Sequence, residues 1–166
     1  MNTKPKSGIS LKPVAAAAVA AIIVASLGAW VTNLGPWYYS LQKPSWEPPD
    51  WLFGPVWTLI FALITAAGLA GWTHARRRGR GLRIVLAFAV NLALNLLWSW
   101  LFFREERPDW ALTEVGFLWV SILCLMVLLW PDSRVGTFLL VPYALWVGFA
   151  AVLNGAVVNL NGPFGR

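Results

Sequence analysis

Two asparagines and a serine recur every four residues within an apolar segment: Asn91, Asn95 and Ser99, with Trp98 beside them. Helical spacing places these polar side chains on one face of a helix. An amide in apolar surroundings is costly unless it is hydrogen-bonded, so this face is expected to point into the protein interior. Two roles fit: hydrogen bonding between helices, which is the commoner use and is favoured, and polar contacts to a bound ligand.

A second face of this kind lies near the C-terminus. Tyr143, Trp146, Ala150 and Asn154 follow one another at spacings that a helix brings to one side, and Pro142 just before them predicts a kink.

The chain holds 12 tryptophans, three of them (Trp37, Trp46 and Trp51) in a proline-rich loop over residues 33–52. The prolines prevent the loop from being helical throughout, so Trp46 and Trp51 are expected either to cover the mouth of a cavity or to lie among lipid headgroups. Trp57 then starts a third face, which continues with Phe61 and Thr65. The three faces predict a cavity with flat apolar walls and few polar groups, typical of a small-molecule site, with ordinary aromatic packing as the alternative.

The sequence contains no conventional catalytic group and no metal-binding cluster. The only histidine, His74, adjoins a run of arginines and is interpreted as an interfacial residue. The only cysteine, Cys124, lies among leucines and is expected to be a small core residue. Glu114 is expected near the outer interface, so ion-coupled transport, which needs a charged group near the midplane, is not favoured.

The composition indicates a membrane protein. Hydrophobic residues make up 58% of the chain and charged residues only 12%, with a mean hydropathy of +0.64, whereas about 25% of the residues of a soluble domain are charged. Five apolar stretches approach the roughly 20 residues that a membrane-spanning helix needs. We therefore predict an all-α integral membrane protein, a five-transmembrane-helix bundle that forms a single domain over residues 1–166, with helices at about 14–32, 53–72, 84–103, 110–130 and 136–158.

The first stretch has some features of a secretory signal peptide, because lysines precede an alanine-rich run. Leu27 does not fit a cleavage site, and alanines at every fourth position suit close helix packing, so we expect the span to be retained.

The positive charges indicate the orientation. With five spans, nine Lys and Arg residues fall on the N-terminal side of the membrane and four on the other, which predicts a cytoplasmic N-terminus and an external loop 33–52. The net charge of +6 requires no nucleic-acid partner, since the arginines between Arg76 and Arg83 are explained by contact with anionic membrane lipid.

Three motifs, in this order, resemble the tryptophan-rich sensory protein family, whose mitochondrial members are the translocator or peripheral benzodiazepine receptor proteins. Residues 37–58 resemble its first loop and second helix, with Leu41-x-Lys43-Pro44-x-Trp46-x-Pro48-Pro49-x-Trp51 and Val56-Trp57-Thr58. Residues 92–103 and 142–154 resemble its third and fifth helices, with Asn95-x-x-Trp98 and Pro142-Tyr143-x-x-Trp146.

The resemblance implies a five-helix bundle, a ligand cavity beneath the first loop, and a homodimer. Family members bind porphyrins such as protoporphyrin IX and haem, as well as synthetic isoquinoline carboxamides and benzodiazepines. The porphyrin or haem would be the ligand, and no cofactor is required. The family's cholesterol motif is not found after Leu153, so we expect a bacterial member, in the inner cell membrane, with the outer membrane as the alternative. The ligand-binding residues that follow from the motifs and the helix faces are Tyr38, Trp46, Trp51, Trp57, Asn91, Asn95, Trp98, Tyr143, Trp146, Ala150 and Asn154.

Three functions remain open. The favoured one is a membrane receptor, binding protein or transporter for tetrapyrroles and other flat apolar ligands, linked to tetrapyrrole or stress regulation. The second is a light-dependent porphyrin-degrading enzyme, in which Trp57 and Trp146 would be redox-active neighbours of the pigment. The third is a structural or lipid-organising protein with an incidental cavity.

Overall fold

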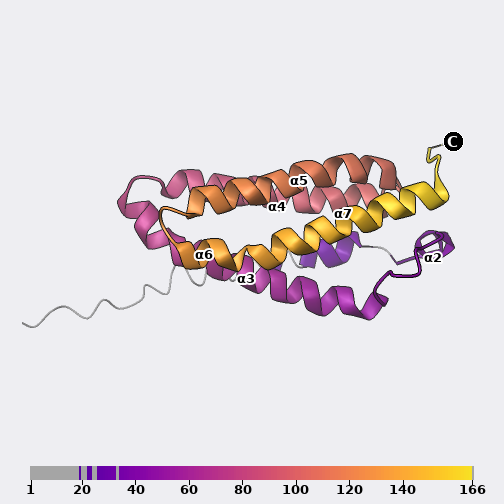
Figure 1. Cartoon of the computed structure of the whole chain (residues 1–166), viewed down its shortest axis with the longest axis horizontal. Helices are drawn as coiled ribbons and strands as arrows, with labels where there is room; N and C mark the ends of the chain where they lie inside the picture. The colour runs from indigo at the N-terminus through magenta and orange to yellow at the C-terminus, as the bar shows by residue number, and fades with distance from the viewer. Residues whose placement is uncertain (1–18, 20–21, 24–25, 33, 166) are drawn as a thin grey trace, which may run out of the picture.

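The computed structural model describes residues 19, 22–23, 26–32 and 34–165, and every regular element in this part of the chain is a helix. Figure 1 shows the long helices running side by side, with short α2 at one end of the molecule. The predicted all-α fold is confirmed for these residues. The helices are α2 (Pro36–Ser40), α3 (Asp50–Arg77), α4 (Gly81–Phe103), α5 (Pro108–Leu129), α6 (Arg134–Leu139) and α7 (Val141–Asn161).

Four helical runs in the described residues are long and apolar enough to cross a bilayer: α3, α4, α5 and the run 134–161 that joins α6 and α7. They correspond to four of the five predicted spans. In the predicted first span, 14–32, residues 19, 22–23 and 26–31 are helical and Thr32 is not, and the other residues of that span lie outside the described part of the chain.

Helix α3 is longer than the predicted span 53–72. It begins at Asp50, whose carboxylate in the first turn interacts favourably with the helix dipole. It ends at Arg77, shortly before Gly79, which has a φ of +69° and donates its amide to the Arg76 carbonyl at 3.1 Å. A left-handed glycine of this kind terminates a helix at little conformational expense.

The predicted kink at Pro142 is a break between α6 and α7 at Leu140. Proline lacks the amide that would continue the helix from α6, and it is well tolerated in the first turn of α7. Ser133 caps α6, because its hydroxyl accepts from the Gly136 amide at 3.0 Å.

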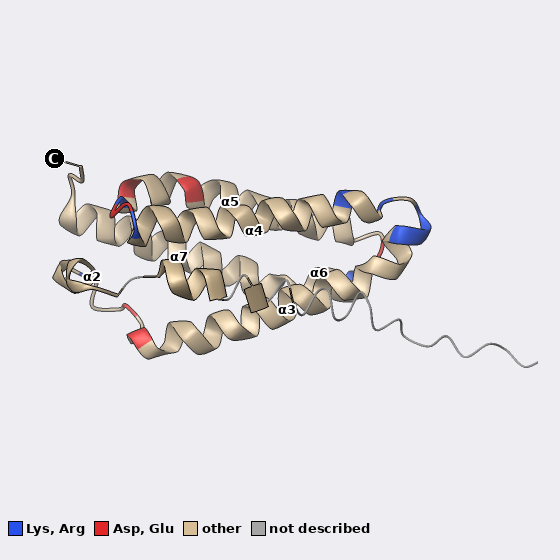
Figure 2. Cartoon of the chain, turned by 180° about the vertical axis from the view of Figure 1, so that it is seen from behind, with Lys and Arg blue, Asp and Glu red and all other residues tan. Residues whose placement is uncertain are grey.

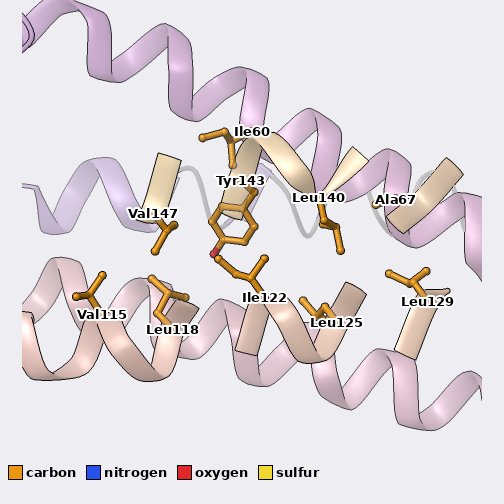
Figure 3. Packing of buried hydrophobic residues seen from close by; sticks show 10 residues of the cluster. All are labelled: Ile60, Ala67, Val115, Leu118, Ile122, Leu125, Leu129, Leu140, Tyr143 and Val147. Atoms are coloured by element: carbon orange, nitrogen blue, oxygen red, sulfur yellow. The ribbon is translucent and has the colours of Figure 1, made fainter. Parts of the chain in front are cut away.

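The core lies where α5 faces α3 and α7. Figure 3 shows aliphatic side chains from these helices around the ring of Tyr143, which is 1% exposed. Helices α5 and α7 contribute residues three or four positions apart, and α3 contributes two residues seven positions apart, as expected for helices with one buried face. The residues of this cluster are Ile60, Ala67, Val115, Leu118, Ile122, Leu125, Leu129, Leu140, Tyr143 and Val147.

Helix α3 packs closely against α6 and α4 but makes few contacts with α7. Its close approach to α6 depends on glycine: a Cβ atom at Gly136 would lie 2.8 Å from the Ala67 carbonyl oxygen. At this end of the molecule, Arg80 also donates to Asp132 at 2.6 Å, joining the α3–α4 turn to the α5–α6 turn. Figure 1 shows α3 and α7 moving apart towards the other end, where α2 lies.

The charges differ between the two ends. Figure 2 shows Lys and Arg gathered at the end where α3 turns into α4, and most of Asp and Glu near the end that carries α2. We call these the basic end and the acidic end.

Replacing Gly136 by alanine is expected to lower stability by about 1–3 kcal/mol, because the added methyl group overpacks the contact with the rigid backbone of α3. The matched control is Gly116→Ala, since a Cβ atom there meets nothing within 4 Å. Thermal unfolding in detergent, followed by tryptophan fluorescence, should show a lower melting temperature for Gly136→Ala only. Equal melting temperatures would contradict this account of the α3–α6 contact.

Candidate ligand-binding cavity

A cavity of about 580 Å³ lies between α3, α4 and α7 at the acidic end. It occupies the space that the divergence of α3 from α7 leaves open, and residues from the first predicted span complete its wall. Most of its lining is apolar. The lining residues are Gly28, Ala29, Thr32, Leu34, Tyr38, Leu41, Lys43, Glu47, Asp50, Trp51, Phe53, Gly54, Trp57, Thr58, Phe61, Asn95, Trp98, Ser99, Phe102, Phe103, Trp146, Ala150, Leu153, Asn154 and Val157.

Helices α3, α4 and α7 bring aromatic rings to the cavity wall, and these rings contact one another in pairs. Trp57 and Phe61 on α3 have ring centroids 5.5 Å apart, and Trp98 and Phe102 on α4 are stacked at 5.3 Å. Trp146 on α7 meets Phe53 of α3 edge to face at 5.7 Å. The first two pairs have the i, i+4 spacing that superposes side chains on a helix. Such walls are suited to a flat apolar ligand.

A buried hydrogen-bond network lies behind this wall. Asn91 donates to Ser121 on α5 at 2.8 Å, the Tyr143 hydroxyl on α7 donates to the Asn91 oxygen at 3.3 Å, and Asn95 donates to that hydroxyl at 3.4 Å. Asn91 is 2% exposed and does not line the cavity, whereas Asn95 does. The favoured interpretation of the asparagine stripe, hydrogen bonding between helices, is therefore confirmed for Asn91. Asn95 is both part of the network and part of the wall.

Asn154 holds α7 against the start of α5. With its amide oriented to satisfy both neighbours, it donates to the Pro108 carbonyl and accepts from the Leu112 amide, each at 3.0 Å. These two backbone groups are the ones that a regular helix pairs in its first turn. Asn154 also lines the cavity, so it joins the wall to the core.

The loop after α2 lies over the mouth of the cavity. Gln42 and Asn161 are joined by two hydrogen bonds. The backbone amide of Gln42 donates to the side-chain oxygen of Asn161 at 2.7 Å, and the side-chain nitrogen of Asn161 donates to the backbone carbonyl of Gln42 at 2.8 Å. This contact fastens the loop to the C-terminal end of α7. Leu41, Lys43 and Glu47 of the loop therefore contribute to the lining.

Four side chains at the mouth form one polar group, which we call the mouth cluster: Tyr38, Lys43, Glu47 and Asp50. The Tyr38 hydroxyl donates to Asp50 at 2.9 Å and to Glu47 at 3.3 Å. The Lys43 ammonium lies 3.6 Å from Glu47, 3.7 Å from Asp50 and 3.5 Å from the centre of the Tyr38 ring. Burial raises the pKa of Tyr38, and the adjacent carboxylates add to the effect. Burial also raises the pKa of Glu47, against the opposing effect of Lys43.

Most of the predicted binding residues lie together on this cavity, and three do not. Trp46 is 48% exposed and packs edge to face on Phe149. Asn91 and Tyr143 are buried in the network behind the wall. The role of all these residues in binding stays a prediction. Those on the cavity are Tyr38, Trp51, Trp57, Asn95, Trp98, Trp146, Ala150 and Asn154.

Several lining residues did not follow from the sequence reasoning, notably Glu47, Asp50 and Phe53. Glu47 and Asp50 stand at the variable positions of the proline-rich motif, so the motif alone does not identify them as residues of the cavity. Their spacing from Lys43 and their place just before α3 could have indicated an ion-pair cluster at the mouth.

The other residues that the sequence analysis singled out lie away from the cavity. His74 is exposed. Cys124 was expected to be a core residue, and this was wrong, because it lies on an exposed face of α5. Glu114, expected near the outer interface, lies in the second turn of α5 and is buried at 6% exposure, and neither carboxyl oxygen has a hydrogen-bond partner in the described part of the chain. Among the described residues, no group of three or more His, Cys, Asp or Glu is placed to hold a metal ion.

Apolar helices of spanning length around an aromatic cavity define a membrane protein that encloses a largely apolar cavity. The sequence profile of the TspO/MBR family matches residues 15–160. The chain belongs to this family and is an integral membrane protein, so the resemblance noted in the sequence is confirmed.

Relatives from different sources cover most of the chain. It is 42% identical over 127 residues to Tryptophan-rich protein TspO of Chlorobaculum tepidum, covering 75% of this chain and 80% of that protein. It is 34% identical over 128 residues to Tryptophan-rich sensory protein of Cereibacter sphaeroides, covering 75% and 77%. It is 32% identical over 151 residues to Translocator protein of Sus scrofa, covering 87% and 89%.

Asn91→Ala is expected to lower stability by about 1 kcal/mol, because it removes the partner of Ser121 and of Tyr143 between buried helices. Ligand affinity should be unchanged, since Asn91 does not line the cavity. Asn159→Ala, at an exposed position of α7, is the control. Melting temperature and porphyrin titration measure the two effects, and a loss of affinity at unchanged stability would instead make Asn91 a ligand contact.

The stability of the mouth is expected to depend on the charge of Glu47. Because the pKa of Glu47 is raised, its contribution to stability is fully present below the ordinary glutamate value of 4.5 and is lost as pH rises through the raised value. Glu47→Gln should therefore gain stability relative to the wild type as pH rises from about 4.5 to 7. Melting temperatures across that range measure the difference, and one that is constant with pH would refute this prediction.

Proposed function

We propose that this protein is a membrane receptor or binding protein that holds tetrapyrroles such as protoporphyrin IX and haem, and other flat apolar ligands, in the cavity beneath the loop after α2. The observation that carries the proposal is the cavity itself, about 580 Å³ in volume and walled by Trp57, Trp98 and Trp146. Its volume falls within the range of small-molecule sites, roughly 300–1,000 Å³.

The character of the wall supports a flat ligand. Indole faces stack on conjugated rings, and each aromatic pair contributes about 0.5–1.5 kcal/mol beyond the burial of area. No His, Cys or Met residue is among the described lining residues, and the hydroxyl of Tyr38, the remaining type of haem ligand there, is engaged with Glu47 and Asp50. We therefore expect the ring of haem, more than its iron, to make the contacts that hold it. The name of the Cereibacter sphaeroides relative, Tryptophan-rich sensory protein, is consistent with a receptor that reports ligand binding.

The proposal includes the architecture and placement expected from the sequence. We infer a fifth spanning helix over residues 14–32, supported by the helical residues 26–31 and by Gly28, Ala29 and Thr32 on the cavity wall. We also infer an N-terminus in the cytoplasm and the acidic end outside, because the basic end carries most of the arginines. The inner membrane of a bacterial cell is proposed as the location, as expected from the helical spans and the family resemblance. A homodimer is proposed on family resemblance alone.

A light-dependent enzyme is the second candidate. The observation that favours it is that Trp57 and Trp146, the residues expected to exchange electrons with an excited pigment, both line the cavity. Illumination of the purified protein with protoporphyrin IX tests it. Loss of the pigment spectrum with a new bound product, abolished in Trp57→Phe and Trp146→Phe, would support catalysis, and unchanged pigment would leave a receptor.

Binding is tested by titrating the protein in detergent with protoporphyrin IX, following tryptophan quenching and the porphyrin absorption band. Saturable binding in the micromolar range is expected. Trp57→Ala and Trp146→Ala should each weaken it about three- to tenfold, because each removes a stacking face of the wall.

Trp130→Ala is the matched control, since Trp130 is half-exposed and lies at the basic end, away from the cavity. It should leave affinity unchanged. Binding that does not saturate, or that is equal in all three variants and the wild type, would indicate adsorption to the apolar surface and favour the structural or lipid-organising role.

A further inference from the structure

The mouth cluster determines the charge that a ligand meets as it enters. Within the described lining, the charged side chains are Lys43, Glu47 and Asp50, one cation and two carboxylates. All three are joined to one another or to Tyr38 by the contacts given above. The mouth therefore carries one net negative charge when both carboxylates are ionised.

Lys43 is not free to receive an anion. Its ammonium stands between two carboxylates at 3.6 and 3.7 Å and over the Tyr38 ring, and its side chain is only 20% exposed. A ligand carboxylate would have to displace one of these partners and leave it without a counter-charge. That exchange gains little, because a like charge replaces a like charge in the same position.

The neighbouring positive groups are engaged as well. Arg107 forms an ion pair with Asp109 at 2.5 Å, and Arg104 donates to the Trp30 carbonyl at 2.5 Å and lies over the Trp30 ring. Neither arginine lines the cavity. The positive N-terminal end of the α3 dipole also faces the mouth, but Asp50 already occupies its first turn.

The acidic end as a whole has the same sign. Apart from Asp132, every acidic residue of the chain lies near this end, as Figure 2 shows. These carboxyl groups outnumber the three cations among the described residues at this end, Lys43, Arg104 and Arg107, so the net charge around the opening is negative. A net negative charge around an opening repels anionic ligands before they make contact.

We propose that the mouth cluster gives the cavity a preference among flat apolar ligands: those whose polar edge carries no free carboxylate bind more tightly than carboxylate-bearing ones with the same ring, and Glu47 and Asp50 are the residues that discriminate between them. This inference rests on the proposed function, and it narrows the ligand class of the same cavity. A neutral polar edge can accept from the Lys43 ammonium, or donate to Glu47 and Asp50, without separating the pairs.

Two porphyrins with the same ring test the inference: protoporphyrin IX, which carries two carboxylates, and its dimethyl ester, which carries none. The wild type in uncharged detergent is expected to bind the ester about three- to tenfold more tightly than the diacid near neutral pH, as expected for like charges separated by several ångströms near water. Affinity for the diacid should rise with salt, because salt screens repulsion, while affinity for the ester stays constant.

Glu47→Gln should increase the affinity for the diacid and leave the affinity for the ester unchanged, so the ratio of ester affinity to diacid affinity should fall. The ester serves as the test that the variant still folds around an intact cavity. Glu106→Gln is the matched control, since it removes the same charge from an exposed position at the same end, outside the cavity. It should leave the ratio of the two affinities close to that of the wild type.

The outcomes are distinct. A wild type that prefers the diacid, with affinity that falls as salt rises, would make Lys43 an anion receptor and overturn the inference while the proposed function stands. Equal affinities with no effect of Glu47→Gln would also overturn it. Absence of saturable binding for both porphyrins would overturn the proposed function, and the inference with it.

Discussion

The cavity depends on how α3 is held. At the basic end, α3 lies against α6 because Gly136 lets the two backbones approach, and Arg80 and Asp132 join the adjoining turns. At the acidic end, α3 makes few contacts with α7. Protein interiors are close-packed, so a gap between two helices persists only if its sides are held apart.

The other side of the gap is held by hydrogen bonds from α7. Tyr143 connects α7 to α4 through Asn91, and Asn154 connects it to the start of α5. In an apolar environment these polar groups have few alternative partners, so the contacts fix the rotation of α7 about its own axis. That rotation directs Trp146 and Ala150 towards α3. The helix that forms the cavity wall is thus positioned by residues that lie mostly behind the wall.

Much of this arrangement could be predicted from the sequence. Period and hydropathy indicated the helices. Most members of two predicted faces line the cavity, whereas Thr65 and Tyr143 of those faces do not; the members on the cavity are Trp57, Phe61, Trp146, Ala150 and Asn154. Helical spacing predicts which residues share a face, but it does not predict how far away the neighbouring helix lies. Asn91 and Asn95 share a face, yet Asn91 meets Ser121 on a closely packed α5, whereas Asn95, one turn nearer the acidic end, also reaches the open space. The same limit applies to Glu114, because its burial results from neighbouring helices and not from its position along α5.

The tryptophans show how one residue type serves different surroundings. Trp57 and Trp146 face the gap, whereas Trp110 and Trp130 are half-exposed near the two ends of α5, where a membrane interface is expected. Trp51 belongs to both groups, since it lines the cavity and is 71% exposed. It stands in the first turn of α3, next to the mouth cluster. The opening thus carries an exposed aromatic ring beside a cluster of charged side chains. Under the proposed function, Trp51 would offer an apolar ligand a contact surface without charge, whereas an anionic ligand would meet Glu47 and Asp50.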